Sequence, residues 1–261
     1  MVEFPLTICV SSRVGLQHQA LIAPFVGRRH LALVITLRVD WEVGSMRRLH
    51  AALAFAALIL MFCPLPAAAE DWLDWQWYGL TGPCDDKCAV MIFGGKFVET
   101  PMEDIFLHGD LSPFGWDYGD SGFIGFSASR EVASFWKERF AIETELGVGK
   151  RFGSMHEAEA WAALFLRYRD FPWNDHLYTT VAVSTGLNYA SGISDEERAR
   201  AGNDRGDRVL HYLAPEITFA LPENKARELV IRFHHRSGAY GLISDADGGI
   251  QYLTVGLRLR F

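Results

Sequence analysis

The sequence has no excess of positive charge: 25 lysines and arginines stand against 32 aspartates and glutamates, which gives a formal net charge of −7. A nucleic-acid binder needs a basic face that neutralises phosphates, so this balance argues against a nucleic-acid partner. Glycine-rich nucleotide-binding patterns and zinc-finger spacings are also absent. These absences exclude the most common nucleotide-dependent and zinc-dependent classes, and no metal or organic cofactor is expected.

Cysteine is scarce, with four residues in the chain, and long apolar runs are missing. The apolar stretch that begins at Ala51 is short for a bilayer and is interrupted by Pro64 and Pro66. Cys84 and Cys88 lie close together in PCDDKC. In an oxidising compartment they could close a small disulfide loop, and two free thiols are the alternative; as a metal site the pair is weak.

Residues 46–69 contain the three parts of a secretory signal peptide. A basic start, MRRLH, is followed by an apolar run of about a dozen residues and by the small residues Ala67, Ala68 and Ala69. The sequence therefore predicts export and cleavage, with a mature chain from Glu70 to Phe261; an uncleaved anchor or a buried helix is the alternative. Residues 1–45 are interpreted as a non-native extension, produced by a start assigned upstream of Met46.

From Glu70 onward, apolar and polar residues alternate with period two over segments of about ten residues. The last segment is the clearest, because every second residue of 253–261 is apolar while the residues between them include Arg258 and Arg260. No convincing amphipathic helix separates the segments. The pattern predicts eight strands, near 89–98, 122–128, 142–149, 162–169, 177–189, 212–221, 229–237 and 252–261.

Alternation alone suits a soluble β-sandwich, a periplasmic barrel or an outer-membrane barrel whose apolar face meets lipid. Three features favour the last: the export signal, the aromatic Phe261 at the end of an alternating strand, and aromatic residues at segment ends, as in interface girdles. These aromatic residues are Trp116, Trp136, Trp161, Tyr168 and Trp173. We therefore expect residues 70–261 to form an all-β, eight-stranded antiparallel transmembrane β-barrel of the outer-membrane type. Such a lumen is filled by side chains, and Glu143 and Glu145 are expected to pair there with Arg167 and Arg169.

Loop lengths orient this barrel. The long connections near 99–121 and 190–207 suit the outside, and the short ones at 171–176 and 222–228 suit the periplasm, with a middling inner link near 129–138. The stretch FHHRSGAY (233–240) then lies near the outer leaflet. Parity along its strand places His235 and Ser237 on the lipid-facing wall and His234 and Arg236 in the lumen.

A hydroxyl and an imidazole facing hydrocarbon cost a few kcal/mol, so His235 and Ser237 need a reason to be there. They lie about 6 to 7 Å apart on one face of a strand, and a Ser-His pair is the minimal activated nucleophile for acyl transfer. The plain alternative is that both residues sit in water and sugar at the headgroup boundary. The other histidines, including His108, His156, His176 and His211, show no ligand spacing and are interpreted as surface or interface positions.

The C-terminal stretch HHRSGAYGLISDADGGIQYLTVGLRLRF resembles the end of the PagL-type lipid A 3-O-deacylases, eight-stranded outer-membrane barrels that hydrolyse the ester-linked acyl chain at position 3 of lipid A. The strong resemblance covers only the last thirty or so residues. It implies that His235 is the general base and Ser237 the nucleophile, with the acyl chains of lipopolysaccharide as the partner and no cofactor.

Two residues depart from the family pattern. Gln251 stands where the family has a Glu that orients the His, and Gly238 stands where an Asn usually follows the Ser. An amide can fix the tautomer of His235, but it cannot stabilise the imidazolium, and losing such a carboxylate typically costs about 10⁴ in rate. Gly238 still offers a backbone N–H to an oxyanion, and Asp245 or Asp247 could supply the missing carboxylate.

The sequence therefore supports two main functions. The first is an esterase of the outer membrane that acts on lipid A or a related acylated lipid, with His235, Ser237 and Gln251 as its catalytic residues. The second is a catalytically inactive structural or lipid-binding barrel of the same ancestry. The sequence is compatible with a monomer or a homodimer.

Overall fold

The computed structural model describes residues 73–109, 111–202, 205–239, 241–246 and 249–261. The predicted extension (1–45), the predicted signal peptide (46–69) and Asp247 lie outside these ranges. No helix within the described ranges is long and apolar enough to cross a membrane.

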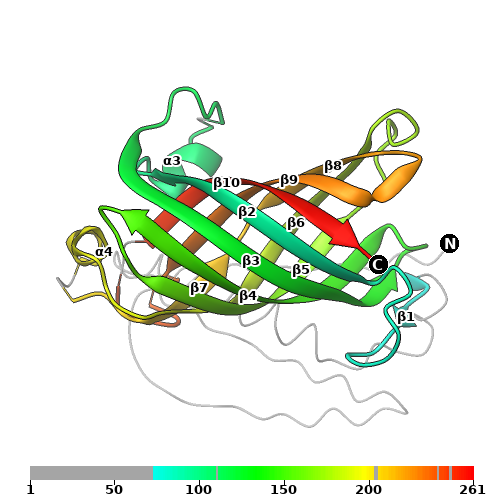
Figure 1. Ribbon diagram of the computed structural model, residues 1–261, viewed down its shortest axis with the longest axis horizontal. Helices are drawn as coiled ribbons and strands as arrows, with labels where there is room; N and C mark the ends of the chain where they lie inside the picture. Colours follow the sequence, from blue (N-terminus) through cyan, green and yellow to red (C-terminus); the bar gives the residue numbers. More distant parts are fainter. Residues whose placement is uncertain (1–72, 110, 203–204, 240, 247–248) are drawn as a thin grey trace, which may run out of the picture. The chain divides into compact units, whose positions relative to one another are not determined.

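Eight antiparallel strands close into a barrel (Figure 1). The ring closes because the last strand pairs with the first, Leu257 opposite Ile92. One strand has two parts, each of which pairs with the same two neighbours, and it is interrupted near Pro215, which has no N–H to donate. In chain order the strands are β2 (Cys88–Val98), β3 (Tyr118–Phe135), β4 (Phe140–Gly153), β5 (Ala158–Tyr168), β6 (Tyr178–Ala190), β7 (Val209–Leu213) with β8 (Glu216–Leu221), β9 (Asn224–Ser237) and β10 (Gly249–Arg260). A short strand, β1 (Gln76–Trp77), adds to β3 outside the ring.

The two faces of the barrel wall differ in polarity. Leu146 is 66% exposed on the outside, whereas Arg232 is fully buried on the inside. Exposed apolar side chains recur on every second residue of the strands, among them Ile92, Ile124, Phe126, Val148, Leu164, Val183, Leu187, Leu229, Val255, Leu257 and Leu259. An apolar outer wall around a charged interior is the reverse of a soluble barrel, and it is the arrangement that lipid requires. The predicted transmembrane β-barrel is confirmed.

Ion pairs fill much of the interior of the barrel. The carboxylate of Glu216 lies 2.8 Å from Arg167, 2.6 Å from Arg232 and 2.7 Å from Arg258. Glu143 accepts two hydrogen bonds from Arg167, as the sequence indicated. Because buried charges are tolerated only when they are paired and hydrogen-bonded, these contacts explain how so many arginines fit inside.

The partner predicted for Glu145 is wrong. Glu145 accepts hydrogen bonds from Arg232 at 2.8 Å, whereas Arg169 bonds Glu131 near the end of the barrel. The sequence alone did not reveal this, because the lumen brings together inward residues from strands that are far apart in the chain.

The connections at the two ends of the barrel differ in length. At one end lie the segments 99–117, 154–157, 191–208 and 238–248, which include the helices α3 (Met102–Phe106) and α4 (Asp195–Arg200). At the other end lie the chain terminus and the turns 136–139, 169–177 and 222–223 (Figure 1). Since outer-membrane barrels have longer outer loops and shorter periplasmic turns, the helical end is the outer end.

The structure decides the state of Cys84 and Cys88, which the sequence left open, and corrects three predictions about connections and an aromatic side chain. Cys84 and Cys88 form a disulfide at the periplasmic end, beside the pairing of Cys88 with the C-terminal residue. The segment 129–138 is mostly strand rather than a link, and the connection predicted at 222–228 is only 222–223. Trp161, expected in an aromatic girdle, points inward and donates to Glu145 at 2.9 Å.

Helix α4 anchors to the outer end of the lumen through Glu197. Its buried carboxylate lies 3.3 Å from Arg151 and 3.3 Å from Arg236, and Ser194 caps the helix by accepting from the Glu197 N–H. Burial raises the pKa of the Glu197 carboxyl, and the two guanidinium groups oppose that rise.

Glu197→Ala is expected to destabilise the barrel by about 3 kcal/mol, because the buried Arg236 loses its carboxylate partner and Arg151 is left with Glu157 and Glu159. Urea unfolding of the detergent-solubilised protein, followed by tryptophan fluorescence, measures the change. Asp195→Ala is the matched control, since Asp195 begins the same helix with a fully exposed side chain. Equal stabilities of the two variants would show that the Glu197 contacts do not hold the helix to the lumen.

Candidate functional site

Neighbouring strands bring the predicted site residues together. In the pairing of β9 with β10, His235 lies directly opposite Gln251, and Ser237 lies directly opposite Gly249. All four positions belong to the outward-facing set, while the intervening His234 and Arg236 are buried inside the barrel. The predicted parity is therefore correct, and the site lies on the outer wall at the end with the long connections.

A chain of hydrogen bonds fixes the imidazole of His235. Its Nδ1 lies 3.1 Å from Gln251 Oε1, and Gln251 Nε2 donates to the carbonyl oxygen of Thr100. Because that carbonyl can only accept, it determines which end of the Gln251 amide faces His235. The acceptor oxygen requires the His235 proton to be on Nδ1, which leaves the Nε2 lone pair available as a base.

The 99–117 connection folds back onto the outer wall beside this site. Phe233, two residues before His235, packs against Phe106 and Trp116 with ring centroids 5.5 and 5.8 Å apart. A small apolar cluster holds the segment in place; its members are Val98, Ile105 and Phe233, with Met102, Trp116 and Leu253 beside them. His235 is consequently only 8% exposed, so protein groups rather than open hydrocarbon surround most of its side chain.

Ser237 is partly exposed at the last position of β9. Its Oγ accepts a long hydrogen bond of 3.5 Å from the Ala239 N–H. Among the hydrogen bonds between described residues, none joins Ser237 to His235. Catalytic hydrogen bonds are often made only in the substrate complex, so this separation is compatible with a resting nucleophile.

Gly249 leaves room for the two side chains to approach each other. A Cβ at this position would lie 2.6 Å from His235 Cε1, 3.0 Å from Ser237 Cβ and 2.6 Å from the Arg236 carbonyl oxygen. The imidazole edge and the serine therefore border one small space above a glycine. Any side chain there would occupy the space in which the nucleophile and its base must meet.

Gly249→Ala is expected to lower kcat for ester hydrolysis about 10²-fold, because displacement of reacting groups by about 1 Å can cost that much. Steady-state acyl release measures the effect. Gly192→Ala is the control, since a Cβ there meets Glu157 at an ordinary 3.4 Å. Unchanged kcat in Gly249→Ala would mean that His235 and Ser237 do not act together above this glycine.

The turn after β9 contains the predicted oxyanion donor, Gly238. Its carbonyl oxygen accepts from the N–H groups of Ile243 and Ser244 at 3.2 and 3.3 Å. A Cβ on Gly238 would lie 2.2 Å from the Ala246 carbonyl oxygen, so the tight turn requires glycine. The role of the Gly238 backbone N–H as an oxyanion donor stays a prediction. Asp245, suggested as a substitute carboxylate, is exposed in the same turn.

His211 is a site residue that the sequence interpretation missed. It lies directly opposite Ser237 in the pairing of β7 with β9, on the outward face. The signal was present, because His211 alternates with Val209 and Leu213 and so interrupts an apolar face. Strand pairing was needed to show that it lies beside Ser237.

No group of three or more metal-ligating side chains occurs in the described ranges.

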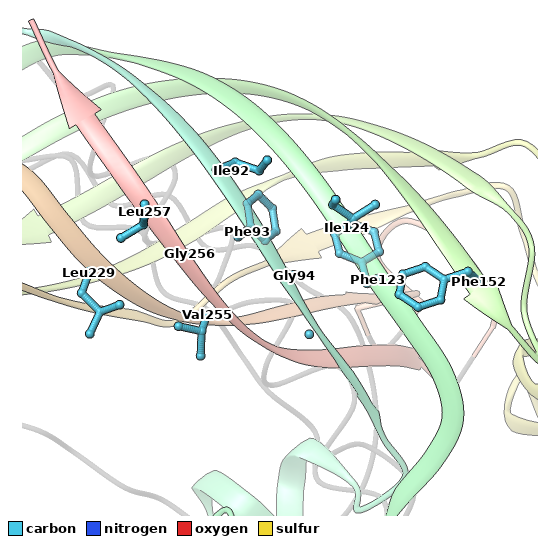
Figure 2. A pocket seen from close by; sticks show the side chains of 11 residues that line it. Ile92, Phe93, Gly94, Phe123, Ile124, Phe152, Leu229, Val255, Gly256 and Leu257 are labelled. Atoms are coloured by element: carbon cyan, nitrogen blue, oxygen red, sulfur yellow. The ribbon is translucent and has the colours of Figure 1, made fainter.

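A separate hollow lies on the outer wall, lined by residues of β2, β3, β4, β9 and β10 (Figure 2). Its volume is about 500 Å³ and its lining is apolar. Ile92, Ile124, Val255 and Leu257 surround Gly94 there (Figure 2). The hollow contains none of the site residues, and its lipid-facing position suits hydrocarbon rather than a polar ligand.

No protein-family model and no curated protein sequence matches the chain. The chain is similar to several solved structures, among them PagL and Neisserial surface protein A. The outer membrane enzyme PagL matches with 10% identity and a TM-score of 0.42, over 66% of this chain and 99% of PagL. Neisserial surface protein A (NspA) matches with 10% identity and a TM-score of 0.42, over 69% of this chain and 100% of NspA. A function for this chain therefore depends on the geometry of its own site.

Proposed function

We propose that this protein is an outer-membrane esterase that hydrolyses an ester-linked acyl chain of lipid A or a closely related acylated lipid. The observation that carries the proposal is the chain of contacts from Thr100 through Gln251 to His235, with Ser237 at the adjacent outward position. These contacts orient the imidazole of His235 as a base on the outward side of the barrel wall, where it belongs neither to the charged interior nor to a pore.

The mechanism uses Ser237 as nucleophile and His235 as base and then acid. Ser237 Oγ attacks the ester carbonyl carbon while His235 Nε2 accepts its proton. The tetrahedral intermediate collapses as the ester C–O bond breaks, and the sugar alkoxide takes the proton from His235. Water then repeats the sequence on the acyl-enzyme, which releases the fatty acid and restores Ser237.

The position of the site explains the choice of substrate. His235 and Ser237 lie on the outward face of the wall, at the end of the barrel with the long connections, which is the end expected at the outer leaflet. An acylated sugar of that leaflet reaches Ser237 by lateral diffusion, with its acyl chains remaining in hydrocarbon. A water-soluble ester would have to enter the membrane boundary first.

Mass spectrometry of lipid A tests the proposal. The full reading frame is expressed in a Gram-negative host, and lipid A from cells with the protein is compared with lipid A from cells with an empty vector. Loss of one ester-linked acyl chain is expected. Unchanged lipid A, with folded protein present in the outer membrane, would favour the second function.

That second function is an inactive structural or lipid-binding barrel. Two observations favour it: Gln251 supplies no negative charge to an imidazolium, and Ser237 makes no hydrogen bond to His235 in the part of the chain that the structure describes. In that case His235 and Ser237 would contact headgroup sugar or phosphate without turnover.

A further inference from the structure

We infer that His211 is a further catalytic residue of this site and that it donates a hydrogen bond to the carbonyl oxygen of the ester as negative charge develops there in the transition state. The inference rests on the proposed esterase function. It adds a side-chain hydrogen-bond donor on the β7 side of Ser237, where the predicted site has no residue.

The first support is position. His211 and Ser237 are direct cross-strand partners, and their Cβ atoms are therefore about 5 Å apart. This is closer than His235, which lies two residues along the same strand at about 6 to 7 Å. On the other side of Ser237 stands Gly249, which has no side chain. Ser237 therefore has the imidazole of His211 beside it on β7 and that of His235 along its own strand, whereas Gly249 on β10 leaves the other side without a side chain.

The second support is the hydrogen bond that holds the His211 ring. Its Nε2 lies 2.9 Å from Thr185 Oγ1 on β6. Thr185 is exposed on the lipid-facing wall, and a hydroxyl that donates to nothing is costly there. Within the described residues its hydroxyl has no other side-chain or backbone acceptor, so it donates to Nε2. The proton of neutral His211 is then on Nδ1, which makes Nδ1 a donor.

The two histidines consequently have different roles, although both are neutral. Gln251 accepts from Nδ1 of His235 and leaves Nε2 as a base, whereas Thr185 donates to Nε2 of His211 and leaves Nδ1–H as a donor. When Ser237 attacks, the carbonyl π electrons move onto oxygen. The Nδ1–H of His211 stabilises that charge without transferring its proton. The backbone N–H of Gly238, the residue after Ser237, is a second donor.

Steady-state kinetics of the full-length protein in detergent, with lipid A in mixed micelles as the probe, tests the inference. His211→Ala is expected to lower kcat about 10²-fold with KM within about twofold of the wild type, because an oxyanion donor acts mainly in the transition state. Thr185→Val keeps the shape of the threonine but removes the hydroxyl, and is expected to lower kcat about 10-fold. His176→Ala is the matched control, since His176 lies in the turn at the opposite end of the barrel.

Each outcome decides something different. A lower kcat with unchanged KM in His211→Ala, and normal kinetics in His176→Ala, supports the inference. A kcat of His211→Ala within about threefold of the active wild type overturns it and leaves the esterase function standing. A rise in KM alone also overturns it, because that result indicates ground-state binding. A wild-type protein that releases no fatty acid overturns the proposed function and this inference together.

Discussion

Ser237→Ala is expected to lower fatty-acid release from lipid A by at least about 10⁴-fold. Ser237 is the only nucleophile in the proposed mechanism, and alanine removes its oxygen while leaving the strand pairing opposite Gly249 intact. The loss should appear in kcat, because the lipid still meets the same wall of the barrel. Mass spectrometry of lipid A after incubation with purified protein measures it.

Thr144→Val is the matched control for Ser237→Ala. Thr144 is another outward hydroxyl, on β4, and its Oγ1 donates to the Arg130 carbonyl oxygen far from the site. Removing it should leave the rate unchanged, which shows that loss of a wall hydroxyl does not itself impair the barrel. If Ser237→Ala and the wild type release fatty acid equally, then Ser237 is not the nucleophile.

The strands could be predicted from sequence because both faces of the wall have strong and opposite preferences. Outward residues in the apolar band meet lipid and inward residues meet the charged lumen, so alternation persists along most of each strand. The ends of the strands were less accurate. The prediction ended the second strand at 128, whereas β3 continues to Phe135, because residues beyond the apolar band leave the hydrocarbon and lose the alternation.

Only part of the site could be predicted in the same way. Parity within β9 correctly placed His235 and Ser237 outward, since that requires only counting by two. The Thr100 carbonyl could not be predicted as a partner, because it lies 151 positions from Gln251 and approaches it only when the 99–117 connection folds onto the wall. His211 was missed for the same reason: its neighbour across the β7 and β9 pairing is not visible in either segment alone.

The hydrogen bond from Gln251 to the Thr100 carbonyl oxygen also changes the physical meaning of Gln251. Judged from sequence, Gln251 is a carboxylate lost from the family pattern. In the structure its amide serves two partners of opposite kind: it donates to the Thr100 carbonyl oxygen and accepts from His235. A carboxylate could satisfy only the second partner. The 99–117 connection and residue 251 are therefore matched, and the amide contributes to holding the loop against the wall.

Gln251→Glu separates these two contributions, and it is the substitution expected to increase activity most. The carboxylate stabilises the His235 imidazolium as the Ser237 proton arrives, and the charge at this position in serine hydrolases contributes up to about 10⁴ in rate. Repulsion from the Thr100 carbonyl oxygen opposes part of this gain, since a lost hydrogen bond costs about 1 kcal/mol or more. We expect kcat to rise by about 10²-fold and the 99–117 connection to become more sensitive to protease.

Gln251→Leu is the matched control variant that removes both hydrogen bonds. Leucine fills a similar volume but can neither accept from His235 nor donate to Thr100. Its kcat should fall about 10²-fold or more as the imidazole loses its fixed tautomer, with the same increase in loop cleavage. Comparable loop cleavage in Gln251→Glu and Gln251→Leu, combined with opposite changes in kcat, would show that charge on the imidazole and attachment of the loop are separate functions of residue 251. If both variants have the kcat of the wild type, residue 251 does not act on His235, and the contact between them is structural only.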